Sequence, residues 1–126
     1  MEFFEAPAFT KFVKFYLQDD EYAEVQRHLE SEPNAGDLIP GTGGLRKLRW
    51  HDRRRGKGKR GGLRIIYYYF VSDYQIWLLS IYDKNEAADL TSNEKKLLRT
   101  AIECELEIRR TKRSGRRKGG GRARPC

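Results

Sequence analysis

The feature that most constrains the fold is a pair of apolar runs, residues 63–71 and 75–82, separated by only a short polar stretch. The first run is rich in Ile, Tyr and Phe and shows little polar alternation, which predicts a buried central strand. Ser72-Asp73 is typical of a turn. Because the connection is so short, the two strands are predicted to pair as an antiparallel hairpin.

The N-terminal half predicts one strand, two helices and a further strand. Residues 2–5 are typical of a strand, and Pro7 suits the first turn of a helix that continues to about residue 16. Asp19 is the predicted N-cap of a second helix. A loop rich in Pro and Gly follows over residues 33–44. Residues 45–50 then alternate roughly between apolar and basic side chains, which predicts another strand.

The C-terminal part predicts a helix and a tail. Thr91 and Glu94 have the spacing of a capping box, so a helix is expected from there to about Arg109. Residues 110–126 are almost all basic or small, which predicts a disordered basic tail. The expected order is β-α-α-β-β-β-α. This order predicts an α+β fold with a small, mostly antiparallel sheet in a single domain over residues 1–109.

The positive charge is concentrated in two segments. The chain has a net charge of +8. Residues 45–64 and residues 109–126 each carry +9, whereas residues 1–44 carry −6 and residues 65–108 carry −4. A concentrated basic patch on an acidic body favours a polyanionic partner such as RNA.

The cysteines, histidines and hydropathy limit the class of protein. Two cysteines do not make the disulfide framework of a small secreted domain, and no apolar run approaches the roughly 18 residues of a membrane span. We therefore expect a cytoplasmic protein with no membrane partner. No metal site is expected, because these four residues do not cluster at ligand spacing: His28, His51, Cys104 and Cys126.

Two basic segments are candidates for binding phosphate. Residues 56–62 place cations between glycines, which let a backbone approach a ligand closely, and Arg64 follows. The alternative is a solvated basic loop. In the strand over residues 45–50, alternation sends Lys47 and Arg49 to one face and Arg46 to the other.

Several aromatic and strand-end residues are open to two interpretations. Trp50 is more typical of a core or edge position than of a base-stacking platform, and His51 of a loop histidine than of a general base. Residues 67–69 are more typical of core than of an RNA platform. Tyr82 and Lys84 stand at a strand end, where the simpler interpretation is a structural one.

The order of these motifs resembles a known family. Residues 41–47 (GTGGLRK), 56–68 (GKGKRGGLRIIYY) and 82–86 (YDKNE) are similar to motifs of the RelE/HigB superfamily, the toxins of type II toxin–antitoxin systems. The resemblance covers about residues 1–108. It implies a fold like that of microbial ribonucleases. It also implies an activity, ribosome-dependent cleavage of mRNA in the A site through the substrate's own 2′-OH, without a metal or other cofactor.

The resemblance also implies a partner and a set of site residues. The partner is a cognate helix-turn-helix antitoxin. Arg64 is the expected clamp on the transition state. The full expected catalytic set is Lys57, Lys59, Arg64, Tyr82 and Lys84, and the expected RNA-binding set is Arg46, Lys47, Arg49 and Arg60.

Two other functions remain as alternatives at this point. A non-catalytic RNA- or ribosome-binding module would use the same basic face, but it would need only phosphate contacts. A role in binding protein or DNA through the basic tail would need only the cations of residues 110–126.

Overall fold

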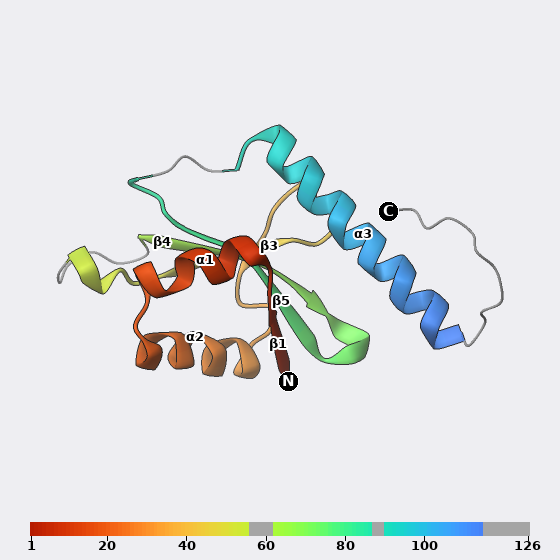
Figure 1. Cartoon of the computed structure of the whole chain (residues 1–126), viewed down its shortest axis with the longest axis horizontal. Helices are drawn as coiled ribbons and strands as arrows, with labels where there is room; N and C mark the ends of the chain where they lie inside the picture. Colours follow the sequence, from red (N-terminus) through yellow and green to blue (C-terminus); the bar gives the residue numbers. More distant parts are fainter. Residues whose placement is uncertain (56–61, 87–89, 115–126) are drawn as a thin grey trace. The chain divides into compact units, whose positions relative to one another are not determined.

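The computed structural model in Figure 1 describes residues 1–55, 62–86 and 90–114. Two compact units are distinguished and are treated separately. The described residues of the first, the sheet unit, are 1–40, 44–55 and 62–86, and those of the second, the helix unit, are 41–43 and 90–114. The described elements are β1 (Glu2–Glu5), α1 (Pro7–Tyr16), α2 (Asp19–Ser31), β2 (Asp37–Leu38), β3 (Arg46–Trp50), η1 (Arg53–Arg55), β4 (Leu63–Phe70), η2 (Val71–Asp73), β5 (Gln75–Asp83) and α3 (Ser92–Ser114).

The sheet is mixed and mostly antiparallel, as predicted. Its strand order over the described residues is β1-β5-β4-β3-β2. The predicted hairpin is confirmed, because β4 and β5 pair antiparallel, as do β3 with β4 and β2 with β3. The edge strand β1 pairs parallel with β5. The α+β fold class is therefore correct, but the two-residue strand β2 falls in the stretch that the sequence predicted as loop.

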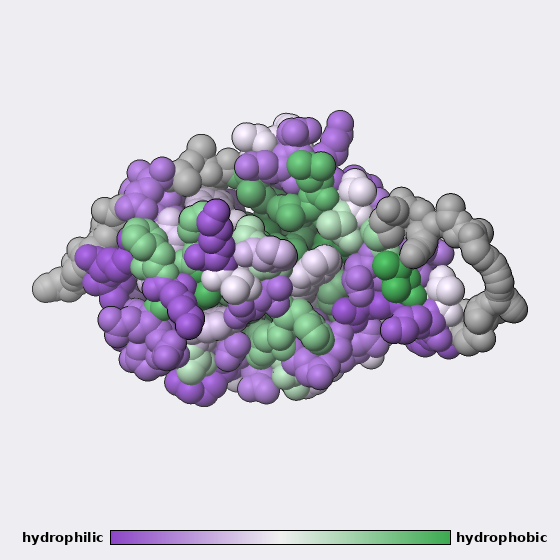
Figure 2. Space-filling view, viewed as in Figure 1, coloured by the Kyte–Doolittle hydropathy of each residue, from purple (hydrophilic) through white to green (hydrophobic). Residues whose placement is uncertain are grey.

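The core of the sheet unit lies between one face of the sheet and the two N-terminal helices, which run beside each other in Figure 1. Phe9 of α1 and Leu29 of α2 are fully buried because their helices turn an apolar stripe toward the strands. The strands contribute these buried core residues: Leu48, Leu63, Ile65, Tyr67, Ile76, Leu78 and Ile81. Outside the core, hydrophilic side chains dominate the surface around α2 (Figure 2).

The start of α2 differs from the prediction by one residue. Asp19 is the first helical residue, and Gln18 is the N-cap. The reason is the carboxylate of Glu21 at the third helical position, which accepts a hydrogen bond from the Gln18 backbone N–H at 2.8 Å. Asp19 lies in the first turn instead, where its charge still favours the helix dipole.

The helix unit consists mainly of α3. The predicted capping box is confirmed: the Thr91 N–H donates to Glu94 Oε1 at 2.9 Å, and the Glu94 N–H donates to Thr91 Oγ1 at 3.1 Å. In the part of the chain that the structure describes, no helix combines the length and hydropathy that a membrane span requires.

The helix α3 ends at Ser114, beyond the predicted end near Arg109. Arg109 Nε donates to Glu105 Oε2 at 2.8 Å, one turn earlier, and Arg110 pairs with Glu107. Such pairs stabilise a helix, and cations near its C-terminus favour the dipole. The first basic residues after Arg109 therefore continue the helix. The rest of the predicted tail lies outside the described residues.

Candidate functional site

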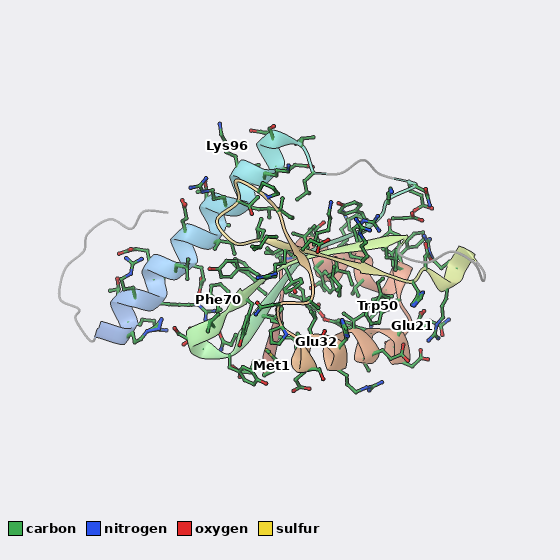
Figure 3. All side chains as sticks on the ribbon, turned by 180° about the vertical axis from the view of Figure 1, so that it is seen from behind. Met1, Glu21, Glu32, Trp50, Phe70 and Lys96 are labelled. Atoms are coloured by element: carbon green, nitrogen blue, oxygen red, sulfur yellow. The ribbon has the colours of Figure 1, made fainter. Side chains whose placement is uncertain are left out.

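Three strand termini meet at one end of the sheet. β3 ends at Trp50, β4 begins at Leu63, and β5 ends at Asp83. Figure 3 shows Trp50 and Phe70 toward opposite ends of the sheet unit, and Glu21 of α2 lies on the side of Trp50. This end, which we call the strand-end site, carries most of the described residues that the sequence singled out for function.

A row of polar side chains crosses the strand-end site. Arg49 of β3 pairs with Arg64 of β4, and Arg64 pairs with Tyr82 of β5. Directly opposed residues on antiparallel strands have Cβ atoms about 5 Å apart and share a face of the sheet. That face is the one opposite to α1 and α2, because the neighbouring residues lie in the core: Leu48, Ile65 and Ile81.

The three members of this row differ in exposure. Arg49 is exposed, whereas Arg64 is 5% and Tyr82 8% exposed. Arg64 Nη1 donates to the carbonyl oxygen of Leu63 at 3.2 Å, which helps to hold the guanidinium along its strand. A guanidinium matches the geometry of a phosphate. The row therefore combines one exposed cation with a nearly buried cation and a nearly buried phenol.

Lys84 lies two residues after Tyr82 of the row, in a turn that hydrogen bonds of the backbone N–H groups stabilise. Its N–H donates to the carbonyl oxygen of Gly62 at 2.9 Å. The side chain of Asp83 accepts the Asn85 N–H at 2.8 Å, and the Asp83 carbonyl oxygen accepts the Glu86 N–H at 2.9 Å. The Lys84 side chain is exposed. The turn thus joins the end of β5 to the residue that precedes β4.

The structure separates Arg46 from the row. Arg46 pairs with Tyr67, a core residue, so it points to the helix side of the sheet, as alternation predicted. Its Nη1 atom donates to the carbonyl oxygens of Gly36 at 2.7 Å and Asn34 at 3.2 Å. Lys47 lies on the face of Arg49. The remaining predicted residues lie outside the described part: Lys57, Lys59 and Arg60.

A partly buried ion-pair cluster lies beside the row, and sequence reasoning missed it. Arg54 Nε and Nη2 donate to the two carboxylate oxygens of Asp52 at 3.0 and 2.9 Å. Nη2 also donates to Asp83 Oδ2 at 3.1 Å and lies 3.6 Å from Glu86 Oε1. The side chains of Asp52 and Asp83 are fully buried. A sequence signal did exist, because Asp52 is the single acid among the ten cations of residues 45–64.

Two rings of α1 complete this cluster. The Arg54 Cζ atom lies 4.9 Å from the ring centre of Phe15 and 4.7 Å from that of Tyr16. The hydrogen bonds to Asp52 raise the pKa of Arg54 above its usual value, so Arg54 stays positively charged at physiological pH. Burial, and then the charge of Glu86, raise the pKa of Tyr16. The phenol therefore stays neutral at physiological pH.

The neighbouring Arg53 is also engaged within the fold. Its guanidinium pairs with three carboxylates of α2: Glu21 at 3.1 Å, Glu24 at 3.3 Å and Asp20 at 3.5 Å. Two of the three consecutive arginines that make this stretch so basic are thus bound to acids of the same chain.

Trp50 and Tyr67 are core residues, and His51 is an exposed residue outside the strands. Trp50 packs against the core, and its ring centre lies 5.6 Å from that of His28. Tyr67 is fully buried in the core, and His51 is exposed. The core interpretations of Trp50 and Tyr67 are therefore correct.

Neither metal ligands nor a known protein family identifies the site. Among residues 1–55, 62–86 and 90–114, no three His, Cys, Asp or Glu side chains gather closely enough to hold a metal ion. In a comparison with the known protein families, the sequence matches none of their models.

Proposed function

We propose that the protein is an mRNA endonuclease that acts on the ribosome, a toxin of the RelE/HigB type with the corresponding ribonuclease-like fold. The observation that carries the proposal is the row formed by Arg49, Arg64 and Tyr82 on adjacent strands. A scissile phosphate needs cations that are fixed before the reaction begins, and a sheet provides such rigidity.

The chemistry follows from the groups in and beside the row. The 2′-OH of the mRNA attacks the adjacent phosphorus, the O2′–P bond forms, and the P–O5′ bond breaks. The proton lost from the 2′-OH is balanced by one delivered to the 5′ oxygen. Arg49 and Arg64 stabilise the negative charge of the phosphorane, while Tyr82 and Lys84 are the described candidates for proton transfer. This reaction requires no cofactor.

The same proposal implies a cellular setting. The substrate is mRNA in the A site of the ribosome, and the protein works in the cytoplasm. A helix-turn-helix antitoxin is its expected partner. A cationic face that binds phosphate is also the natural target for an acidic inhibitor.

The first test is induced expression in a bacterial host with mapping of RNA 5′ ends. Wild type is expected to arrest growth and to yield new ends within the codons of translated messages. Arg64→Ala is expected to do neither, because its phosphate clamp is lost. New ends in untranslated RNA alone would contradict dependence on the ribosome.

Matched variants separate lost chemistry from lost folding. Arg64 is almost buried, so Arg64→Lys and a thermal unfolding scan accompany Arg64→Ala. Arg49 is exposed, so Arg49→Ala is expected to weaken RNA binding at unchanged stability. Arg46→Ala should instead lower stability, since its guanidinium binds backbone carbonyls.

A non-catalytic RNA-binding module is the second candidate, because the row by itself needs only to bind phosphate. Tyr82→Phe distinguishes the two functions. It removes one hydroxyl group and keeps both cations, so an endonuclease would lose turnover while RNA affinity stays unchanged. Binding of ribosomes by wild type without any new RNA ends would favour the module.

A further inference from the structure

Arg54 connects three segments that meet at the strand-end site. It lies on η1, and it binds Asp52, two residues after the end of β3, and Asp83 at the end of β5. It also lies over the ring of Tyr16 at the end of α1. One side chain thus ties two strand ends and a helix end together.

The contacts of Asp83 extend this connection to Lys84. While Asp83 Oδ2 accepts from Arg54, its other carboxylate oxygen accepts the Asn85 N–H, and the Lys84 N–H binds the carbonyl oxygen of Gly62. The ion pair between Arg54 and Asp83 therefore holds the Asp83 side chain in place, and this side chain organises the turn. Lys84 lies inside this turn, two residues after Tyr82 of the row.

The surroundings of Arg54 make it a poor ligand for RNA. The carboxylates of Asp52, Asp83 and Glu86 lie within 3.6 Å of its Nη2 atom. Three negative charges around one cation do not attract a phosphate. The Arg54 side chain is also only 28% exposed, and two aromatic rings lie against it.

We propose that Arg54 is a positioning residue, which holds the Asp83–Glu86 turn and so places Lys84 beside the Arg49–Arg64–Tyr82 row. The proposal rests on the proposed function for its catalytic consequence. Its structural part, the dependence of the turn on Arg54, is independent of that function. Arg54 thus contributes a support for the site rather than a contact with RNA.

The experiment compares wild type with Arg54→Ala in the full-length protein. Arg53→Ala is the matched control, since Arg53 is an adjacent arginine that pairs with α2 instead. Asp52→Asn is the milder second variant, because it weakens the hold on Arg54 without removing a side chain. Two quantities are measured: kcat and KM for cleavage on ribosomes programmed with mRNA, and hydrogen exchange of individual amides.

Arg54→Ala is expected to lower kcat by roughly 100-fold with little change in KM, because a small displacement of a catalytic group has this effect. The amides of Lys84 and Asn85 should exchange roughly tenfold faster or more. The Ala6 amide, which binds the Leu78 carbonyl oxygen, should keep its protection if the domain is folded. Asp52→Asn should give the same pattern with smaller changes, and Arg53→Ala should give neither effect.

Three results would overturn the proposal. One is a raised KM at unchanged kcat in Arg54→Ala, which would make Arg54 a substrate contact. Another is that Arg54→Ala keeps both the kcat and the KM of wild type, and the third is unchanged protection of Lys84 and Asn85 in both Arg54→Ala and Asp52→Asn. If wild type itself cleaves nothing, the proposed function fails, and the exchange data still decide whether Arg54 holds the turn.

Discussion

At the scale of the residue, Tyr67 shows how one side chain joins distant segments. Its hydroxyl group donates to the Pro33 carbonyl oxygen at 2.7 Å and accepts the Gly36 N–H at 2.9 Å. Arg46 binds the same loop through the Gly36 carbonyl oxygen. A buried phenol needs such partners, because an unsatisfied hydroxyl group in a core costs free energy. The loop after α2 is thereby attached to β3 and β4.

Gly36 has no room for a side chain. A Cβ atom there would lie 2.9 Å from the Tyr67 ring and 3.0 Å from the backbone of Lys47. We expect Gly36→Ala to lower the free energy of unfolding by about 1–3 kcal/mol, measured by urea denaturation. Gly62→Ala is the control, because its Cβ would meet Asp52 at an ordinary 3.5 Å. Equal stability of the two variants would contradict this account.

At the scale of the element, α3 shows how local interactions set the limits of a helix. The reciprocal hydrogen bonds of Thr91 and Glu94 begin it, and pairs of acids and arginines one turn apart support its last turns. The helix remains strongly charged, and a sequence of this kind is helical mainly through such local pairs.

The cap of α3 makes a prediction. Thr91→Ala removes the oxygen that accepts the Glu94 N–H, so the first turn should lose about 1 kcal/mol of stability. Hydrogen exchange of the Glu94 amide should accelerate several-fold. Thr91→Ser keeps the hydroxyl group and should exchange like wild type. Equal rates in Thr91→Ala and wild type would show that the cap contributes nothing.

At the scale of the whole molecule, some of the basic charge on the described residues is neutralised by acids of the same chain. Arg53 and Arg54 pair with acids that lie up to about 30 residues away in sequence. A count of cations therefore overstates the surface charge near the sheet. The exposed Arg49 and Lys84 belong to what remains available for a polyanion.

Three tyrosines make stability sensitive to alkaline pH. Burial is the main cause that raises the pKa of Tyr16, Tyr22 and Tyr67, and a hydrogen bond to Glu5 adds to it for Tyr22. The folded state then holds protons that the unfolded chain releases near pH 10. Stability contributed by these groups is fully present below about pH 10 and is lost as the pH rises through the folded-state values.

The corresponding measurement is a series of urea denaturation curves from about pH 8 to 11. The free energy of unfolding should fall steadily above about pH 10. Tyr22→Phe should flatten this fall, since it removes one of the three groups. A rise in stability above pH 10 would contradict the assigned directions of the pKa shifts.

Much of the site followed from local pattern, and part of it did not. Alternation along β3 correctly separated Arg46 from Lys47 and Arg49, because side-chain direction in a strand depends only on position. The partners of Arg54 were not predictable, since Asp83 and Tyr16 come from distant segments. Asp52 is the single acid among the cations of residues 45–64, but only the structure shows its role, which is to bind Arg54.

The sequence by itself determined the helices, the central hairpin and the capping box of α3, because periodicity, turn residues and capping act over a few residues. Only the tertiary structure decided that β3 lies beside β4 and which residues face each other across the strands, and hence that Arg49, Arg64 and Tyr82 form one row. The tertiary structure also decided which cations form ion pairs with acids of the same chain. Both depend on the register and packing of segments far apart in the chain, which local pattern does not specify.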